Sequence, residues 1–207
     1  MFIVLEGGEG AGKTTLARAL SQRLEDEGYF VTLTREPGGT AVGEAVRQLL
    51  HLELTPWAET FAFLTARAQL VAEVVRPALA DGQVVICDRF AASTFAYQGF
   101  ARGLDLWQLR AANAIATGSL EPDLVLYLDL PPEVGLVRKV GEEEAIRTGL
   151  EGLEFHRLVR AGYLELASYA GDGEWLTLDA TQPPEQIAEQ AWAAVKERIA
   201  ERPVREE

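Results

Sequence analysis

The chain alternates between two patterns of apolar and polar residues. Short runs rich in valine, isoleucine and leucine have the length of strands, and the stretches between them place an apolar residue at every third or fourth position, as one face of a helix does. We expect strands at residues 2–6, 29–34, 84–88, 124–130 and 175–179. We expect helices at residues 13–27, 41–50, 57–80, 106–117, 133–140, 154–170 and 184–202. Strands that are apolar throughout and joined by helices are typical of a parallel sheet covered on both faces, so the pattern predicts an α/β fold with a five-stranded parallel sheet flanked by helices.

The segment that follows the first expected strand is rich in glycine. Residues 7–14 read Gly-Gly-Glu-Gly-Ala-Gly-Lys-Thr and match the G-x-x-x-x-G-K-T pattern of a phosphate-binding loop. The backbone N–H groups of such a loop and the start of the next helix bind phosphate oxygens. We expect Lys13 to reach the β- and γ-phosphates of a nucleotide and the Thr14 hydroxyl to ligate Mg²⁺. A glycine-rich turn without a ligand is the alternative, and the expected strand and helix on either side disfavour it.

A second group of polar residues follows the third expected strand. In an open parallel sheet, ligands bind at the carboxyl ends of the strands, and this strand ends in Asp88-Arg89. Arg89 is placed to hold a phosphate through two parallel hydrogen bonds. Asp88 resembles the carboxylate that holds Mg²⁺ in P-loop proteins, with a structural cap or an ion pair to Arg89 as the alternatives.

Composition narrows the class of protein. At 207 residues, we expect a single domain spanning 1–207. The formal net charge of −13 argues against a nucleic-acid partner, which needs a basic face. No apolar stretch reaches the roughly 18 residues of a membrane span, and no leader-like segment opens the chain, so we expect no membrane contact and a cytoplasmic location. The single cysteine, Cys87, excludes an intramolecular disulfide and is expected to be a buried thiol.

These segments and several others resemble the thymidylate kinase family, in the family's order, from residue 1 to about residue 200. The phosphate loop alone is common to a superfamily. The more specific segments are Thr34-Arg35-Glu36-Pro37-Gly38-Gly39-Thr40, Ala66-Arg67-Ala68-Gln69-Leu70, Asp88-Arg89-Phe90, Ser93-Thr94-Phe95-Ala96-Tyr97-Gln98-Gly99, Pro122-Asp123 and Leu126-Tyr127-Leu128-Asp129. The resemblance implies a three-layer P-loop kinase that transfers the γ-phosphoryl group of ATP to dTMP with Mg²⁺ and forms a homodimer.

The family pattern implies a donor site for ATP around the phosphate loop. Its implied residues are Gly7, Gly8, Glu9, Gly10, Ala11, Gly12, Lys13, Thr14, Thr15 and Arg138. Thr14 and Asp88 are implied as metal ligands. The cations implied in catalysis are Lys13, Arg89 and Arg147.

The same resemblance implies a second pocket for dTMP. Its implied residues are Glu9, Glu36, Phe63, Arg67, Arg89, Ser93, Thr94, Tyr97 and Gln98. Phe63 and Arg67 lie four residues apart and share a helix face, and the family pattern has Phe63 stack on thymine while Arg67 bonds its carbonyl. Core packing of Phe63 and a solvated helix charge at Arg67 are the alternatives.

The other acceptor residues have roles implied in the same way. Tyr97 would crowd the 2′ position and select against a ribose, and Glu9 would meet the sugar 3′-hydroxyl and help arrange the metal. For Gln98, which is implied to line the acceptor pocket, the alternative interpretation is a side chain exposed to solvent. Glu36 is expected near the acceptor, with an ion pair to Arg35 as the alternative.

Residues 138–152 match the mobile LID of the family but differ in charge. Family members without an arginine in the phosphate loop supply basic residues from the LID, and this loop has no arginine. Here three glutamates, 142–144, occupy the LID tip, and we expect them to form a solvated surface. Arg147 is the leading candidate for the cation at the transferring phosphate, followed by Arg138 and then by Arg157 and Arg160.

The sequence leaves two questions undecided: which related function the protein has, and which residues form the dimer face. A kinase of another nucleotide or of a nucleoside, and a P-loop switch protein without an acceptor, would carry the same phosphate loop. The apolar residues of 57–80 and 106–117 could form the dimer face or simply belong to the core.

Overall fold

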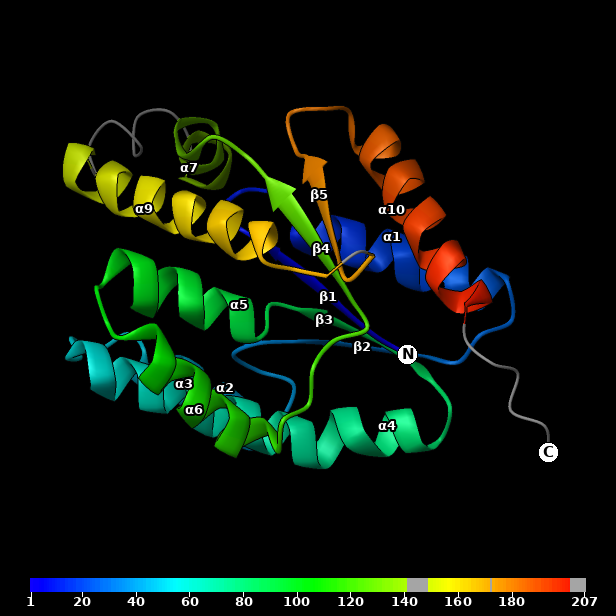
Figure 1. The fold of residues 1–207 in the computed structure, drawn as a ribbon, viewed down its shortest axis with the longest axis horizontal. Helices are drawn as coiled ribbons and strands as arrows, with labels where there is room; N and C mark the ends of the chain where they lie inside the picture. Colours follow the sequence, from blue (N-terminus) through cyan, green and yellow to red (C-terminus); the bar gives the residue numbers. More distant parts are fainter. Residues whose placement is uncertain (141–148, 172, 202–207) are drawn as a thin grey trace.

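The computed structural model describes residues 1–140, 149–171 and 173–201. Its centre is a five-stranded sheet in the order β2-β3-β1-β4-β5, in which neighbouring strands are parallel (Figure 1). The strands are β1 Phe2–Gly7, β2 Val31–Arg35, β3 Val84–Asp88, β4 Leu124–Asp129 and β5 Trp175–Asp179. The predicted α/β fold with a five-stranded parallel sheet is confirmed.

Helices cover both faces of this sheet (Figure 1). They are α1 Lys13–Asp26, α2 Ala41–Leu49, α3 Pro56–Leu70, η1 Val71–Val75, α4 Arg76–Ala80, α5 Ala91–Thr94, η2 Phe95–Ala101, α6 Leu106–Thr117, α7 Pro132–Val140, α9 Gly149–Ser168 and α10 Pro184–Ala200. Side chains alternate across β1, because successive residues of a strand point to opposite faces. Ile3 and Leu5 pack with α1 and α10, whereas Phe2 and Val4 pack with η1 and α4, and three layers result.

The strand register brings three polar segments to one edge of the sheet. Asp88 of β3 pairs with Leu5 of β1 on one side and with Arg35 of β2 on the other. The phosphate loop, the turn after β2 and the segment after β3 therefore leave the sheet side by side. Loops at the carboxyl ends of parallel strands are where such folds bind ligands.

The helix expected at 57–80 is helical throughout but not regular. The π-helical segment η1 separates α3 from α4, and the backbone N–H of Arg76 bonds to the carbonyl of Val71, five residues earlier. Pro77 follows directly, and a proline has no N–H to donate to the carbonyl four residues before it. The hydrogen bonds of the helix therefore change from a four-residue to a five-residue spacing just before the proline.

Residues 91–101 form a helix that the apolar pattern did not predict. α5 and η2 together span this segment. Its small and aromatic residues, with Gly99 among them, give no helical period, and glycine disfavours a helix interior. Four of the residues expected around the acceptor lie on this helix.

Smaller differences occur at element ends. β2 begins at Val31 rather than at 29, and the preceding Phe30 is exposed. α9 begins at Gly149 rather than at 154, and residues 141–148 of the expected LID lie outside the described residues.

Cys87 is a buried free thiol, as predicted, and burial raises its pKa. No helix among the described residues is both long and apolar enough to cross a membrane.

Candidate active site

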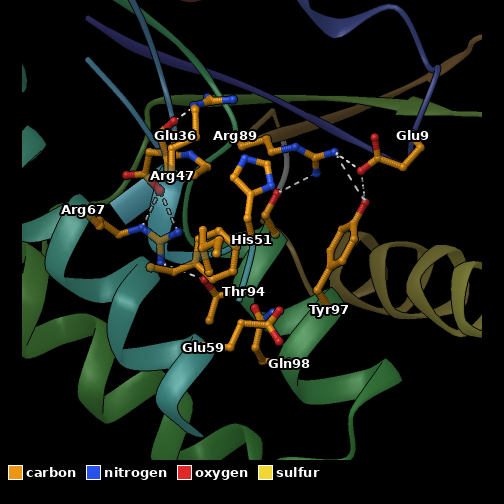
Figure 2. A pocket seen from close by; sticks show the side chains of 14 residues that line it. Glu9, Glu36, Arg47, His51, Glu59, Arg67, Arg89, Thr94, Tyr97 and Gln98 are labelled. Carbon is orange, nitrogen blue, oxygen red and sulfur yellow. Dashed lines mark hydrogen bonds and ion pairs between the residues drawn. The ribbon is translucent and has the colours of Figure 1, made fainter. Parts of the chain in front are cut away.

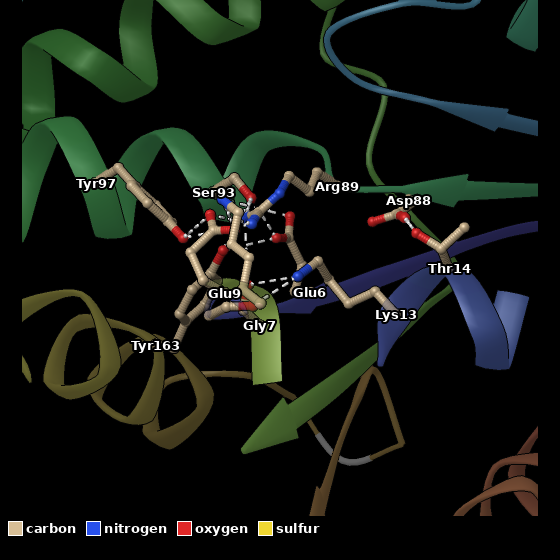
Figure 3. Close-up of polar contacts among 12 residues, drawn as sticks. Glu6, Gly7, Glu9, Lys13, Thr14, Asp88, Arg89, Ser93, Tyr97 and Tyr163 are labelled. Carbon is tan, nitrogen blue, oxygen red and sulfur yellow. Dashed lines mark hydrogen bonds and ion pairs between the residues drawn. The ribbon is translucent and has the colours of Figure 1, made fainter. Parts of the chain in front are cut away.

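The phosphate loop connects β1 to the start of α1. Gly10 and Gly12 have positive φ angles of 67° and 94°, at which L side chains are strained, so the loop needs glycine at both positions. Lys13 folds back over the loop, where its Nζ donates to the carbonyl oxygens of Gly7 at 3.1 Å and Gly8 at 2.7 Å (Figure 3). These bonds hold the ammonium group above the loop backbone.

The Lys13 ammonium group is nearly buried. Burial lowers its pKa to about 7, and the charge of Arg89 also lowers it, against the effect of three surrounding carboxylates. A bound phosphate would add negative charge beside Lys13 and favour the charged form. The loop is therefore suited to a polyanion.

Two oxygen atoms that suit a hard cation meet where α1 begins. The Thr14 hydroxyl donates to Asp88 Oδ2 at 2.5 Å (Figure 3). Arg89 forms its ion pair with Glu9 rather than with Asp88, so the Asp88–Arg89 pair considered from sequence is wrong. In the described part of the chain, no group of three or more histidine, cysteine or carboxylate side chains converges as a metal site.

Arg89 lies between the phosphate loop and a neighbouring cavity. Its φ of 76° is unusual for a residue other than glycine. Its Nη1 donates to the Gly7 carbonyl at 3.1 Å and to Ser93 Oγ at 3.2 Å, and its Nη2 donates to Glu9 Oε1 at 3.0 Å. A strained backbone persists only where the surroundings hold it, and such positions concentrate at functional sites.

Glu6 holds the turn that follows Arg89. Its fully buried carboxylate accepts the backbone N–H groups of Phe90 at 2.9 Å and Ser93 at 3.2 Å. It also accepts the hydroxyls of Ser93 at 2.6 Å and Tyr163 at 2.9 Å (Figure 3). Burial raises the pKa of Glu6, and these hydrogen bonds oppose the rise. Neither Glu6 nor Tyr163 was predicted as a site residue, although a charged residue in an otherwise apolar strand was a signal for Glu6.

Glu9 places a carboxylate inside the phosphate loop. Its Oε1 accepts from Arg89 at 3.0 Å and from the Tyr97 hydroxyl at 3.2 Å, and its Oε2 accepts from Lys139 Nζ at 2.7 Å. Burial raises the pKa of Glu9, but Arg89 and Lys139 outweigh burial and lower it to about 2. Glu9 is therefore ionised at neutral pH and held between two cations.

A cavity of about 290 Å³ opens beside Arg89 (Figure 2). Every residue predicted for the acceptor lines it: Glu9, Glu36, Phe63, Arg67, Arg89, Ser93, Thr94, Tyr97 and Gln98. Five further lining residues were not predicted: Pro37, Arg47, Leu50, His51 and Glu59. Most of these five come from α2, its end and the start of α3, for which the sequence pattern indicated only amphipathic helices.

Arg67 is buried at the wall of this cavity, with its side chain 1% exposed. Its Nε donates to Glu36 Oε2 at 2.8 Å, and its Nη2 donates to the Phe90 carbonyl at 2.9 Å. Its Nη1 donates to Thr94 Oγ1 and to Asn113 Oδ1, both at 3.0 Å. A solvated helix charge at Arg67 is therefore wrong.

Glu36 is the counter-ion of Arg67, at 2.7 Å. The alternative pair with Arg35 is wrong, because Arg35 pairs with Glu44. Burial raises the pKa of Glu36, and the charge of Arg67 opposes the rise. Glu36 Oε1 and Arg47 Nε are buried without a hydrogen-bond partner among the described residues. Both side chains line the cavity, so a ligand or water there would satisfy them.

Gln98 and Phe63 complete the wall. Gln98 is 2% exposed and donates to Glu59 Oε1 at 2.9 Å, so its solvated alternative is wrong. Phe63 is half-buried and lines the cavity one helical turn from Arg67. An aromatic ring and a buried guanidinium therefore face the same space.

A second cavity, of about 340 Å³, borders the phosphate loop and the segment after β5. Its lining includes Ala11, Gly12, Thr15, Leu16, Arg138, Ala180, Gln182 and Ile187. Arg138, predicted for the donor site, donates from Nη1 to the Ala180 carbonyl at 3.0 Å. This cavity adjoins the loop where a nucleotide's phosphates would bind, so it has room for the nucleoside end.

The basic residues expected at the transferring phosphate differ in their ion-pair partners. Arg147 lies outside the described residues. The two least favoured candidates pair with carboxylates that are not in the phosphate loop: Arg157 with Glu133 at 2.8 Å and Arg160 with Asp129 at 2.7 Å. Lys139, which was not predicted, is the residue that pairs with Glu9.

A phosphate loop flanked by two cavities, with an arginine between the loop and one of them, defines a P-loop phosphotransferase that acts on two anionic substrates. A family model for thymidylate kinase matches residues 5–191. A thymidylate kinase of Synechococcus sp. (strain JA-3-3Ab) is 52% identical over 202 residues, which cover 96% of this chain and 97% of that protein. A thymidylate kinase of Deinococcus radiodurans is 48% identical over 201 residues, which cover 96% of this chain and 97% of that protein. The crystal structure of thymidylate kinase from Ehrlichia chaffeensis superposes with a TM-score of 0.78 at 27% identity, over 94% of this chain and 98% of that one. The chain belongs to the thymidylate kinase family.

Proposed function

We propose that this protein phosphorylates dTMP to dTDP, with ATP as the phosphoryl donor and Mg²⁺ as the metal. The position of Arg89 carries the proposal, because its guanidinium contacts the phosphate loop at Gly7 and Glu9 and also lines the cavity of about 290 Å³, the acceptor cavity. Phosphates bound on the two sides would meet at this arginine, and a cation there screens the charges that transfer brings together. A P-loop switch protein has no use for the acceptor cavity.

The acceptor cavity suits a deoxynucleoside monophosphate. Phe63 offers a flat apolar ring for the base, and Arg67 lies beside it. Because each nitrogen of Arg67 already has a protein partner, a base carbonyl would share one of these donors. The Tyr97 hydroxyl bonds to Glu9 and its ring lies against Arg89, so Tyr97 would close the sugar side and disfavour a 2′-hydroxyl.

The residues present at the start of α1 fit Mg²⁺. Thr14 and Asp88 supply two oxygens at one place, and Mg²⁺ usually takes one or two protein oxygens and completes its shell with phosphate oxygens and water. Thr14 and Asp88 would hold the ion, directly or through water. When bound, the ion neutralises part of the phosphate charge.

The donor is proposed to bind across residues 7–15 with its nucleoside end in the cavity beside Arg138. Lys13 then contacts the phosphates. Arg147 stays the predicted cation for the transferring phosphate. The acceptor phosphate is a competent nucleophile at neutral pH, so Glu9 and Glu36 serve positioning rather than proton abstraction.

We also propose that the protein is a homodimer that acts in the cytoplasm. The support for a dimer is an apolar stripe on α6, where Trp107 and Ile115 are 75% and 85% exposed, together with the exposed Phe61 on the adjoining α3. Large exposed apolar groups on neighbouring helices mark contact surfaces. A two-fold axis would place the same stripe of each chain face to face.

An assay of ADP release tests the proposed function. The chain is supplied with ATP and Mg²⁺, and dTMP, dUMP, dCMP, dGMP or thymidine is offered in parallel. We expect release that depends on dTMP and is far weaker with the other acceptors. Preference for another acceptor would keep the kinase and discard the thymine pocket, and release that is independent of any acceptor would contradict the proposal.

A further inference from the structure

Helix α7 packs directly against the backbone of the phosphate loop. A Cβ added to Gly135 would overlap the carbonyl oxygen of Glu9, and a Cβ added to Gly10 would overlap the carbonyl oxygen of Gly135. Glycine at both positions lets the backbone of the helix approach the backbone of the loop. The position of α7 relative to the loop is therefore fixed at this contact.

Lys139 lies four residues after Gly135, on the same face of α7. Its side chain is 53% exposed, and its Nζ lies 2.7 Å from Glu9 Oε2. Of the basic residues that the structure describes between 138 and 160, Lys139 alone forms an ion pair with the phosphate loop. The same helix face that rests on the loop thus delivers a cation to its carboxylate.

The negative charge of Glu9 inside the phosphate loop needs an explanation. The loop binds phosphates, and a carboxylate in it repels them unless cations offset its charge. Arg89 occupies one oxygen of Glu9, and Lys139 occupies the other. Without Lys139, the second oxygen would be free to turn its charge toward the phosphates.

We propose that Lys139 is a positioning residue for phosphoryl transfer, which holds Glu9 against Arg89 and offsets the negative charge of Glu9 beside the transferring phosphate. Lys139 acts through Glu9, in the site whose kinase function is itself proposed above. A surface ion pair without function is the plain alternative, because most exposed pairs contribute little. The alternative predicts that loss of Lys139 leaves turnover unchanged.

Steady-state kinetics with ATP, Mg²⁺ and dTMP separate these two outcomes. Lys139→Met should lower kcat about tenfold or more, which is within the range of coupling between contacting residues. Lys139→Arg should recover most of the loss, because the charge returns. Lys196→Met is the matched control, since Lys196 is an exposed lysine on α10, and it should leave kcat unchanged.

A double-mutant cycle tests whether Lys139 acts through Glu9. In a Glu9→Gln background there is no carboxylate charge to offset, so Lys139→Met should then lower kcat by less than about twofold. An equal loss in both backgrounds, or parental kcat in Lys139→Met itself, would overturn the proposal. Thermal midpoints of all variants exclude a loss of fold, and Lys139→Gln serves if the Met variant is unstable. A parent chain that is inactive with dTMP would overturn the proposed function, whereas an active parent with an equally active Lys139→Met would overturn only the role of Lys139.

Discussion

Arg67 and Arg89 are two arginines of one cavity with different surroundings. Arg67 is enclosed by protein acceptors and has Glu36 as its counter-ion. Arg89 shares its donors among Gly7, Ser93 and Glu9, at the boundary with the phosphate loop. We infer that Arg67 supports the cavity wall, whereas Arg89 is the arginine placed to meet phosphate.

Replacing Arg67 by methionine should therefore test stability as well as binding. Arg67→Met leaves Glu36 buried without a counter-charge, so we expect the free energy of unfolding to fall by about 3–5 kcal/mol at neutral pH. Burial raises the pKa of Glu36 above 4.5, so the folded state binds its proton more tightly than the unfolded state does. The loss should accordingly shrink at acidic pH, where the carboxyl is neutral.

Urea unfolding at neutral and acidic pH measures this loss. Adding Glu36→Gln to Arg67→Met should recover part of the stability, because it removes the uncompensated charge. A loss below about 1 kcal/mol, or one that does not change with pH, would show that the buried pair does not stabilise the fold.

At the scale of elements, the contact of α7 with the phosphate loop leaves less room for an added methyl group than any other contact at a glycine of the described residues. Gly135→Ala should improve helix propensity by about 1 kcal/mol, yet its Cβ would overlap the carbonyl oxygen of Glu9. We expect overpacking to prevail, with a net destabilisation of about 1–3 kcal/mol and a higher KM for ATP as α7 moves off the loop.

Gly152 on α9 is the matched control for this substitution. A Cβ at Gly152 would meet no atom within 4 Å. Gly152→Ala should raise the thermal midpoint slightly and leave the KM for ATP unchanged. If Gly135→Ala behaves like Gly152→Ala in both measurements, the close packing of α7 on the loop is wrong.

Elements with a strong local pattern were predictable from sequence, and those set by tertiary contacts were not. The strands and the phosphate loop follow from apolar runs and from the glycines that need positive φ. The helix at 91–101 has no apolar period, and the π-helical step in 71–75 depends on a single proline. The phosphate-loop residues came from a motif in the chain, and the acceptor-cavity residues came from the resemblance to the thymidylate kinase family. The supporting Glu6 and Lys139 were not predicted, because their partners lie far away in sequence.

For the molecule as a whole, the distribution of charge is uneven. The net charge is −13, yet cations gather where β1, β3 and α7 meet: Lys13, Arg89 and Lys139. Carboxylates of Glu6, Glu9 and Asp88 lie among these cations, so positive charge is concentrated locally at the site and does not form a basic face. This arrangement suits small anions and disfavours an extended polyanion on the outer surface.

The proposed dimer makes a prediction at the same scale. Trp107→Lys combined with Ile115→Lys should give a monomer, because a two-fold axis would bring the new like charges together. Phe30→Lys is the control, since Phe30 is 82% exposed beside β2 and outside the α3 and α6 surface. Sedimentation velocity measures the outcome. A monomeric parent chain, or a dimer that survives the double substitution, would contradict the proposed interface.

The most direct test of phosphoryl transfer between the two cavities follows the phosphorus atom itself. ATP labelled at its γ-phosphorus is incubated with the protein, Mg²⁺ and dTMP, and the labelled product is identified. We expect the label in dTDP, in amounts equal to the ADP formed. Label released as inorganic phosphate, or left in ATP while dTMP is present, would contradict a site that joins two substrates at Arg89.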